Sequence, residues 1–95
     1  MKRIKKLNIE KPYLVYLEWM DAVASSRWMK YDEVLEWVNA NLVPIKEVGW
    51  LLHQDDTCIV LGSRRHDYED GTIFEVGQIE WIPRAWVVKL KRIVL

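Results

Sequence analysis

The side chains that most often act as nucleophiles or bases are scarce in this sequence, which has one cysteine, Cys58, and two histidines, His53 and His66. A cysteine nucleophile needs a base within reach and an electropositive surrounding that lowers its pKa. His53 could approach Cys58 across a predicted hairpin, but the nearby Asp55 and Asp56 would raise the pKa of the thiol. We therefore interpret Cys58 as a structural residue.

The acidic side chains do not match a metal site or an acid–base pair. The stretch 66–70, His-Asp-Tyr-Glu-Asp, has neither the multiple His or Cys ligands of a zinc site nor the alternating oxygen ligands of a calcium loop. The adjacent Asp55-Asp56 pair is typical of a turn, where aspartate makes local hydrogen bonds. We expect no catalytic residue, no metal site and no cofactor.

Arginines close to aromatic rings are better candidates for binding. Arg64 and Arg65 stand near Tyr68, and Arg84 stands near Trp86. A guanidinium group recognises phosphate or carboxylate with two parallel hydrogen bonds, and a neighbouring ring can stack on a base. The alternative is that Arg64 and Arg65 form local salt bridges with the acidic residues that follow them.

Tryptophan is unusually frequent, with six residues, and aromatic side chains make up 12% of the sequence. Four tryptophans lie inside predicted strands or the predicted helix and are expected in the core: Trp19, Trp37, Trp50 and Trp81. Trp28, beside Met29, has no periodic reason to be buried. Exposed Trp and Met are typical of interfaces, so Trp28 is the leading candidate for partner contact.

The length of the chain and its charge distribution indicate how many domains it forms and how copies of it could interact. A chain of 95 residues predicts one domain, 1–95, with little core to spare. The net charge is zero, but residues 1–11 carry +4 and residues 84–95 carry +4, which leaves −8 between them. Copies of such a chain could attract one another, or the ends could be merely solvated. Residues 1–11 are expected to form a basic arm, ordered or flexible.

The N-terminal sequence and the hydropathy favour a cytoplasmic protein without membrane contact. The basic start is not followed by the apolar run of a signal peptide. No stretch approaches the roughly 20 apolar residues that span a bilayer. The lone cysteine cannot form an intramolecular disulfide, which agrees with a reducing compartment.

Aromatic and β-branched residues separated by turn signals predict five strands. The predicted strands are 13–20, 45–53, 57–62, 72–81 and 87–93. Residues 54–56 are predicted as a turn and 64–71 as a charged loop. In the last strand, Val88 and Leu90 are expected to face the core and Lys89 and Lys91 the solvent.

One short helix is predicted at 33–41. Val34, Leu35, Val38 and Leu42 recur at helical spacing, with Asp32 as the N-cap. Such a short helix is unstable alone, so we expect it to dock on the sheet.

This order of elements predicts a mostly β fold, a small SH3-like or Sm-like five-stranded barrel with one inserted short helix. Pro83 fits the first position of a single 3₁₀ turn before the last strand. The alternative is an α+β roll, in which the helix lies across an antiparallel sheet.

Several short motifs resemble a known group of proteins when they are read in order. They are Val15-Tyr16-Leu17-Glu18-Trp19-Met20-Asp21-Ala22, Val48-Gly49-Trp50-Leu51-Leu52, Cys58-Ile59-Val60-Leu61-Gly62 and Ile82-Pro83-Arg84-Ala85-Trp86-Val87. Over residues 13–92 the chain resembles short uncharacterised proteins encoded by tailed bacteriophages and prophages. The resemblance brings no catalytic residues. It implies a viral accessory role in the host cytoplasm, where small domains inhibit host proteins or sequester host signalling molecules.

These observations predict a non-catalytic, phage-type accessory binding module that forms a homo-oligomer. It would bind a host protein, or sequester a small phosphorylated or nucleotide signal as an anti-defence protein. Nucleic-acid binding through the basic ends is an alternative, which the neutral overall charge disfavours. An enzyme is the third alternative, but the chain lacks a recognisable nucleophile–base pair and a glycine-rich phosphate loop.

Overall fold

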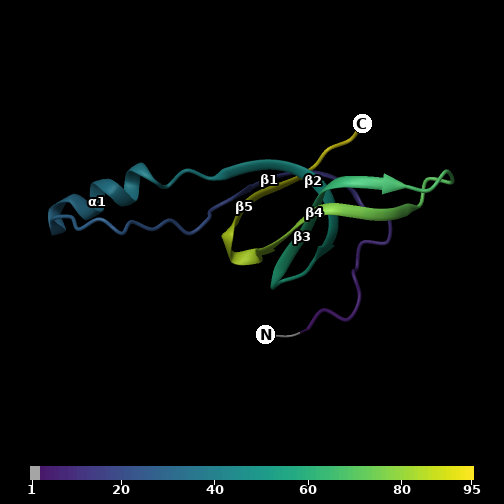
Figure 1. The fold of residues 1–95 in the computed structure, drawn as a ribbon, viewed down its shortest axis with the longest axis horizontal. Helices are drawn as coiled ribbons and strands as arrows, with labels where there is room; N and C mark the ends of the chain where they lie inside the picture. The colour runs from purple at the N-terminus through teal and green to yellow at the C-terminus, as the bar shows by residue number, and fades with distance from the viewer. Residues whose placement is uncertain (1–2) are drawn as a thin grey trace.

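The computed structural model describes residues 3–95, which form five antiparallel strands, one α-helix and one 3₁₀ turn (Figure 1). The elements in chain order are β1 (Tyr13–Trp19), α1 (Tyr31–Ala40), β2 (Ile45–Gln54), β3 (Cys58–Asp67), β4 (Ile73–Pro83), η1 (Arg84–Trp86) and β5 (Val87–Arg92). The predicted mostly β class with one short helix is confirmed. The single 3₁₀ turn after Pro83 is confirmed as well.

The five strands form one sheet in the order β4-β3-β2-β1-β5. Each neighbouring pair is antiparallel. Within residues 3–95, no strand pairing joins β4 to β5, so the sheet is open and the predicted closed barrel is not confirmed. Both β4 and β5 therefore have a free outer edge.

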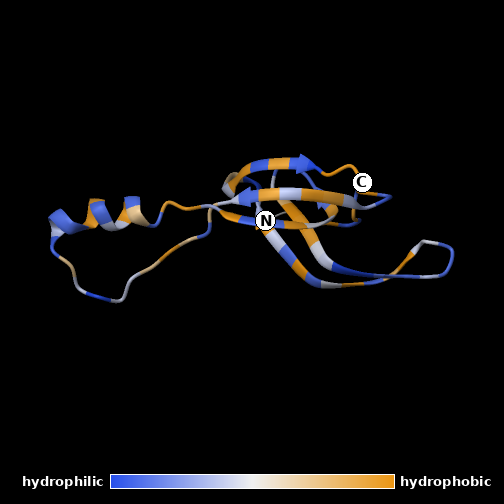
Figure 2. Ribbon diagram, turned by 90° about the horizontal axis from the view of Figure 1, so that it is seen from above, coloured by the Kyte–Doolittle hydropathy of each residue, from blue (hydrophilic) through white to orange (hydrophobic). Residues whose placement is uncertain are grey.

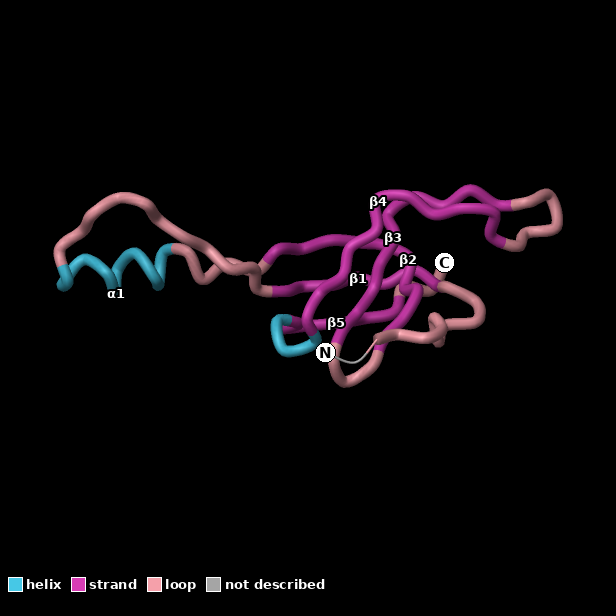
Figure 3. The backbone as a smooth tube through the Cα atoms, turned by 60° about the horizontal axis from the view of Figure 1, so that its bottom comes forward, coloured by secondary structure: helices cyan, strands magenta, loops and turns pink. Residues whose placement is uncertain are grey.

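Figure 3 shows that the strands of the sheet curl, and two apolar clusters are buried on it, the smaller consisting of Leu52, Cys58 and Val60. The larger cluster involves all five strands. Its buried members come from four strands: Val15, Leu17, Trp19, Leu51, Ile59, Leu61 and Ile82. Val87 and Leu90 of β5 pack against the same cluster. Burying each large apolar side chain contributes about 1.5–3 kcal/mol. Because all five strands share this cluster, an open sheet can form a core without a second layer.

The facing of β5 differs from the alternation expected from its sequence. The register between β1 and β5 shifts at Glu18/Trp19, where a bulge leaves Val88 without a partner. Val87 and Leu90 consequently point to the core, and Val88 is exposed. The prediction that Val88 faces inward is wrong, because a bulge breaks the two-residue period that the prediction assumed.

Half of the stretch predicted as a charged loop at 64–71 is strand. β3 continues to Asp67, and β3 and β4 form a ribbon that extends past the rest of the sheet (Figures 1 and 3). The turn that closes it has hydrogen bonds from Tyr68 N to Thr72 O (2.7 Å) and from Gly71 N to Tyr68 O (2.9 Å). Gly71 adopts a φ of +87°, which glycine tolerates without strain. Charged residues fit this ribbon because its side chains are largely exposed to solvent.

The segment between β1 and β2, residues 20–44, projects from the sheet and is called the arm below (Figures 1 and 2). Its helix α1 has no buried residue. The expected docking of the helix on the sheet is therefore wrong. The Asp32 N-cap is wrong too, because the helix begins at Tyr31 after Lys30 and has no side-chain cap. The curled sheet buries its apolar face by itself and leaves the helix without a place in the core.

The projections make the molecule long. Its dimensions are 59 × 31 × 21 Å and its radius of gyration is 17.1 Å. A compact domain of this length would have a radius of gyration of about 12 Å. The excess comes from the arm at one end and the β3–β4 ribbon at the other.

Candidate functional site

The arm carries the most exposed aromatic side chains of the described residues. Trp28 is 98% exposed and Tyr31 is 94% exposed. Along α1, Tyr31, Leu35 and Val38 recur at helical spacing and are all exposed. Figure 2 shows apolar and polar positions alternating around this helix. Trp28 is thus exposed, as its sequence context predicted.

Local hydrogen bonds define the helix of the arm. Glu33 N donates to Lys30 O at its start (2.9 Å), and Asn41 Nδ2 donates to Trp37 O at its end (2.8 Å). Asp32 and Glu33 lie at the positive N-terminal end of the helix, where negative charge is favourable. A helix of 10 residues is marginal in water without tertiary contacts. A partner that covered its apolar stripe would therefore stabilise the helix.

The six tryptophans are mostly outside the core. Only Trp19 is buried, Trp37 and Trp50 are half-buried, and Trp28, Trp81 and Trp86 are exposed. The expectation that Trp81 lies in the core is wrong, because it stands on β4 at the sheet edge and is 44% exposed. The expectation for Trp37 is also wrong, because its helix does not reach the core.

Arg65 is held by contacts within the protomer. Its guanidinium group lies 4.6 Å from the Trp50 ring centroid, and Nε donates to Asp67 Oδ1 (2.6 Å). It also donates to the carbonyl oxygens of Pro12 (3.4 Å) and Gly71 (3.3 Å). For Arg65 the local salt bridge weighed from the sequence is confirmed, so this side chain ties the ribbon to the chain before β1.

The other predicted binding residues do not gather at one place. Arg64 lies opposite Gly77 on the ribbon, whereas Arg84 lies in η1 and donates to Gln54 Oε1 (3.1 Å). Pro83, which precedes Arg84, pairs with Cys58. Cys58 and Arg64 are six residues apart along β3, or about 20 Å. Tyr68 packs against Phe74 with ring centroids 5.1 Å apart, and Trp86 shares η1 with Arg84. Two separate arginine–aromatic groups result.

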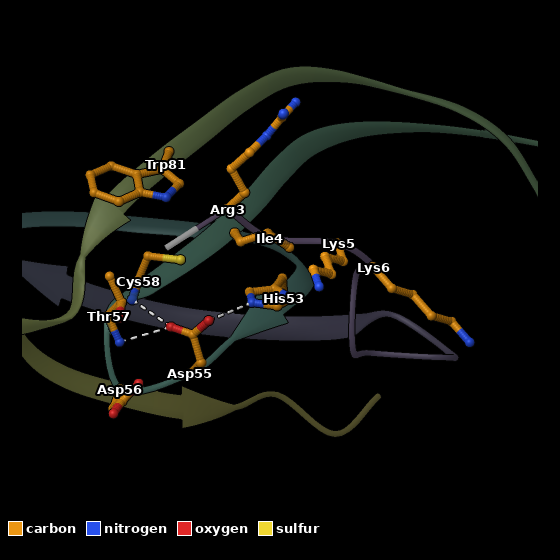
Figure 4. Close-up of a pocket in the computed structure, with 10 residues that line it drawn as sticks. All are labelled: Arg3, Ile4, Lys5, Lys6, His53, Asp55, Asp56, Thr57, Cys58 and Trp81. Carbon is orange, nitrogen blue, oxygen red and sulfur yellow. Dashed lines mark hydrogen bonds and ion pairs between the residues drawn. The ribbon is translucent and has the colours of Figure 1, made fainter. Parts of the chain in front are cut away.

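A cavity of about 430 Å³ lies between residues 3–6 and the β2–β3 turn (Figure 4). It is lined by Arg3, Ile4, Lys5, Lys6, His53, Asp55, Asp56, Thr57, Cys58 and Trp81. The sequence did not predict it, because residues 1–11 gave no sign of where they would lie. Residues 1 and 2 fall outside the described part of the chain.

Asn8 fixes the N-terminal segment beside β2. Its side chain accepts from Gln54 N (3.1 Å) and donates to Gln54 O (2.6 Å), as a neighbouring strand would. Its backbone N–H donates to His53 Nδ1 (3.2 Å). These contacts bring the basic residues that precede Asn8 to the cavity.

Three potential metal ligands meet at the floor of this cavity, where His53, Asp55 and Cys58 have their ligand atoms within 4.8 Å of one another. Figure 4 shows the three side chains pointing toward one another. His53 Nε2 lies 2.8 Å from Asp55 Oδ2. Asp55 Oδ1 accepts from the backbone N–H groups of Thr57 (2.8 Å) and Cys58 (2.9 Å). The hydrogen bond from His53, followed by those from Cys58 and Thr57, lowers the pKa of Asp55 to about 2.

The hydrogen-bond pattern disfavours both metal binding and nucleophilic chemistry at this trio. Because Asn8 N–H donates to His53 Nδ1, the ring proton of neutral His53 is assigned to Nε2, which donates to Asp55. Both ring nitrogens are then engaged. Burial, and after it the Asp55 charge, raise the pKa of the Cys58 thiol and disfavour the thiolate. The trio is built to hold the turn.

A second polar group lies where β2 and β4 approach each other across the curl. Trp19 Nε1 donates to Glu47 Oε1 (2.6 Å). Hydrogen bonding with Glu47, and then burial, raise the pKa of Glu80 to about 7. In its protonated form, Glu80 can donate a hydrogen bond to Glu47. No sequence signal pointed to this pair, because its members lie on strands separated by β3.

Comparison with protein-family models, curated proteins and solved structures finds no match for this chain. Among residues 3–95, no helix has the length and apolar character to cross a membrane.

Proposed function

We propose that this protein is a non-catalytic accessory binding module that assembles with copies of itself and presents the arm to a protein partner. The observation that carries the proposal is the uncovered apolar stripe of α1, with Trp28 and Tyr31 almost fully exposed. An amphipathic helix that places its apolar face in a hydrophobic groove is a common mode of protein recognition. Trp and Tyr are enriched among the residues that dominate binding energy.

The phage resemblance of the sequence supports a host protein as the partner. An accessory protein that acts on a host protein needs a contact surface and no chemistry of its own. The engaged ring nitrogens of His53, the raised thiol pKa of Cys58 and the local contacts of Arg65 all agree with such a role.

The test is partner capture from a bacterial lysate with matched variants of the arm. A protein retained by the native chain is purified, and its dissociation constant is measured for the native protein, Trp28→Ala and Leu35→Asp. We expect each substitution to weaken binding by about 30-fold or more, as for a central contact residue. Lys46→Ala, outside the arm, is the control. Equal affinity of all four proteins would refute the role of the arm.

The cavity favours a second candidate function, sequestration of a small anionic ligand such as a nucleotide. It combines an exposed indole, Trp81, with the basic residues Arg3, Lys5 and Lys6. A ring for stacking and cations for phosphate are the elements of such a site. Calorimetric titration with mononucleotides and cyclic dinucleotides tests it. Binding that is lost in Trp81→Ala supports this function, and the absence of heat with every nucleotide refutes it.

A further inference from the structure

We infer that copies of this chain assemble through their sheet edges, with the outer edge of β4 in one protomer against the outer edge of β5 in the next. This inference rests on the oligomer included in the proposed function and identifies the surfaces that form it. The occupant of each edge is a second copy of this chain.

Both edges are available for pairing. The strand order places β4 and β5 at opposite ends of the sheet. Among the described residues, no backbone hydrogen bond links the outer edge of either strand to another strand. An edge strand presents a row of unpaired N–H and C=O groups, which pair readily with a strand of another chain. Two free edges on one protomer allow each copy to bind two neighbours.

The two edges carry opposite charge. β4 contains Glu75 and no basic residue, and its second carboxyl, Glu80, adds little negative charge at pH 7 because contact with Glu47 raises its pKa to about 7. β5 contains Lys89, Lys91 and Arg92 and no acidic residue. Charge therefore favours β4 against β5 and disfavours β5 against β5. Contacts between two different surfaces of the same chain are heterologous, and they build closed rings or open filaments.

Exposed apolar side chains accompany both edges. Phe74, Ile79 and Trp81 on β4 are about half-exposed, and Val88 on β5 is exposed at the bulge. Edge pairing would cover these side chains, which a lone protomer leaves in water. Gln78 has a φ of +52°, which interrupts the regular edge of β4. The stretches on either side of Gln78 are similar in length to β5.

Two edge variants and light scattering test the inference. The β5 variant is Lys89→Glu with Lys91→Glu, and the β4 variant is Glu75→Lys with Ile79→Lys. All four side chains are exposed, and circular dichroism checks that both variants fold. We expect the native protein to be oligomeric and each variant to be monomeric. The control, Lys46→Glu on β2, is expected to remain oligomeric.

Mixing the variants tests the pairing itself. The β4 variant keeps a native β5 edge, and the β5 variant keeps a native β4 edge. A mixture is expected to assemble at least to the heterodimer, because the native β5 edge of the β4 variant can pair with the native β4 edge of the β5 variant. A native protein that is monomeric at about 1 mM overturns the inference. So does a β4 variant that still oligomerises, because that result points to another interface.

These outcomes are separable from those of the proposed function. Monomeric edge variants that bind the arm's partner as the native protein does leave the role of the arm intact. Conversely, a Trp28→Ala protein that loses its partner while remaining oligomeric leaves the edge inference intact.

Discussion

Single side chains determine how the β2–β3 turn and the N-terminal segment of this protein are held. Asp55 organises the turn by accepting from Thr57 and Cys58 on one oxygen and from His53 on the other. His53 in turn accepts from Asn8, which pairs with the backbone of Gln54. Through this chain of contacts, His53 and Asp55 hold the turn and the N-terminal segment together.

The acid sensitivity of the protein should reflect Asp55. Its folded pKa of about 2 lies below the ordinary value of 3.8, so its stabilising contacts are complete above about pH 4 and are lost as the pH falls toward 2. In Asp55→Asn, urea midpoints should fall less between pH 4 and 2 than in the native protein. Asp56→Asn, an exposed neighbour in the same turn, is the control. Parallel pH profiles of native protein and Asp55→Asn would contradict the assignment.

Glu80 should have the opposite effect at higher pH. Its folded pKa of about 7 lies above the ordinary value of 4.5, so it contributes stability that is complete below about pH 4.5 and lost as the pH rises through 7. Glutamine can donate to Glu47 at every pH. We therefore expect Glu80→Gln to raise the melting temperature at pH 8 by a few degrees (about 4–8 °C for each kcal/mol regained).

The same comparison at pH 4 should show little difference, because native Glu80 is protonated there. Glu75→Gln, on the exposed part of the same strand, is the control substitution. A Glu80→Gln protein that gains nothing at pH 8 relative to pH 4 would exclude the hydrogen bond from Glu80 to Glu47.

Residue types in the sequence predicted some of these roles and not others. The turn at Asp55-Asp56 could be predicted because its hydrogen bonds are local in the sequence, as could the smaller part of the rise in the Cys58 pKa, which comes from Asp55. The Glu47–Glu80 pair and the Asn8–Gln54 contact could not, because tertiary folding brings their partners together over long sequence distances.

At the scale of elements, the strands could be predicted from β-favouring residues and turn signals, the helix from its apolar spacing, and the 3₁₀ turn from Pro83. The errors concern the surroundings of an element, such as what covers a helix or whether a charged stretch pairs as a strand. The residue pattern of the element does not reveal these surroundings. The amphipathic pattern of α1 predicts a partner for its apolar face but does not say that the partner is another part of the same chain. The charged residues 64–67 suggested a loop, yet a solvated two-stranded ribbon accepts them equally well.

The stability of the protein should depend on the sheet and hardly at all on the arm. Leu61 is fully buried, so Leu61→Ala should cost about 2–5 kcal/mol of unfolding free energy. Leu35 is exposed on α1, so Leu35→Ala should change it by about 0.5 kcal/mol or less. Urea denaturation measures both. Comparable losses for the two variants would mean that α1 packs on the sheet in solution.

Replacement of the arm gives a stronger form of the same prediction. Trp19 and Ile45 are paired across β1 and β2, so a short turn can connect the two strands after residues 21–43 are removed. We expect the shortened protein to keep its β-sheet circular dichroism spectrum and a cooperative transition. Under the proposed function it would also lose the protein partner. A shortened chain that cannot fold would assign the arm a structural role.

At the scale of the whole molecule, neither the burial of the tryptophans nor the shape could be predicted. Four of the six tryptophans were expected in the core, and only Trp19 is buried. The elongated outline, with a radius of gyration of 17.1 Å, could not be predicted. It results from where the arm and the ribbon point, which the residues of each segment do not determine alone.

The uneven charge of this neutral chain predicts that assembly weakens with salt. The Debye length falls from about 30 Å at 0.01 M to about 3 Å at 1 M salt, so attraction between the acidic β4 edge and the basic β5 edge is screened. Exposed ion pairs contribute about 0.2–1 kcal/mol each. One such pair, at Glu75, corresponds to a rise in the dissociation constant of about 1.4-fold to 5-fold, measurable by analytical ultracentrifugation. In Lys89→Gln with Lys91→Gln, the assembly should be weaker at low salt and nearly independent of salt.

Native assembly that tightens as salt increases would instead indicate that apolar contacts such as those of Val88 and Ile79 dominate. The charge-based choice of β4 against β5 would then lose its basis.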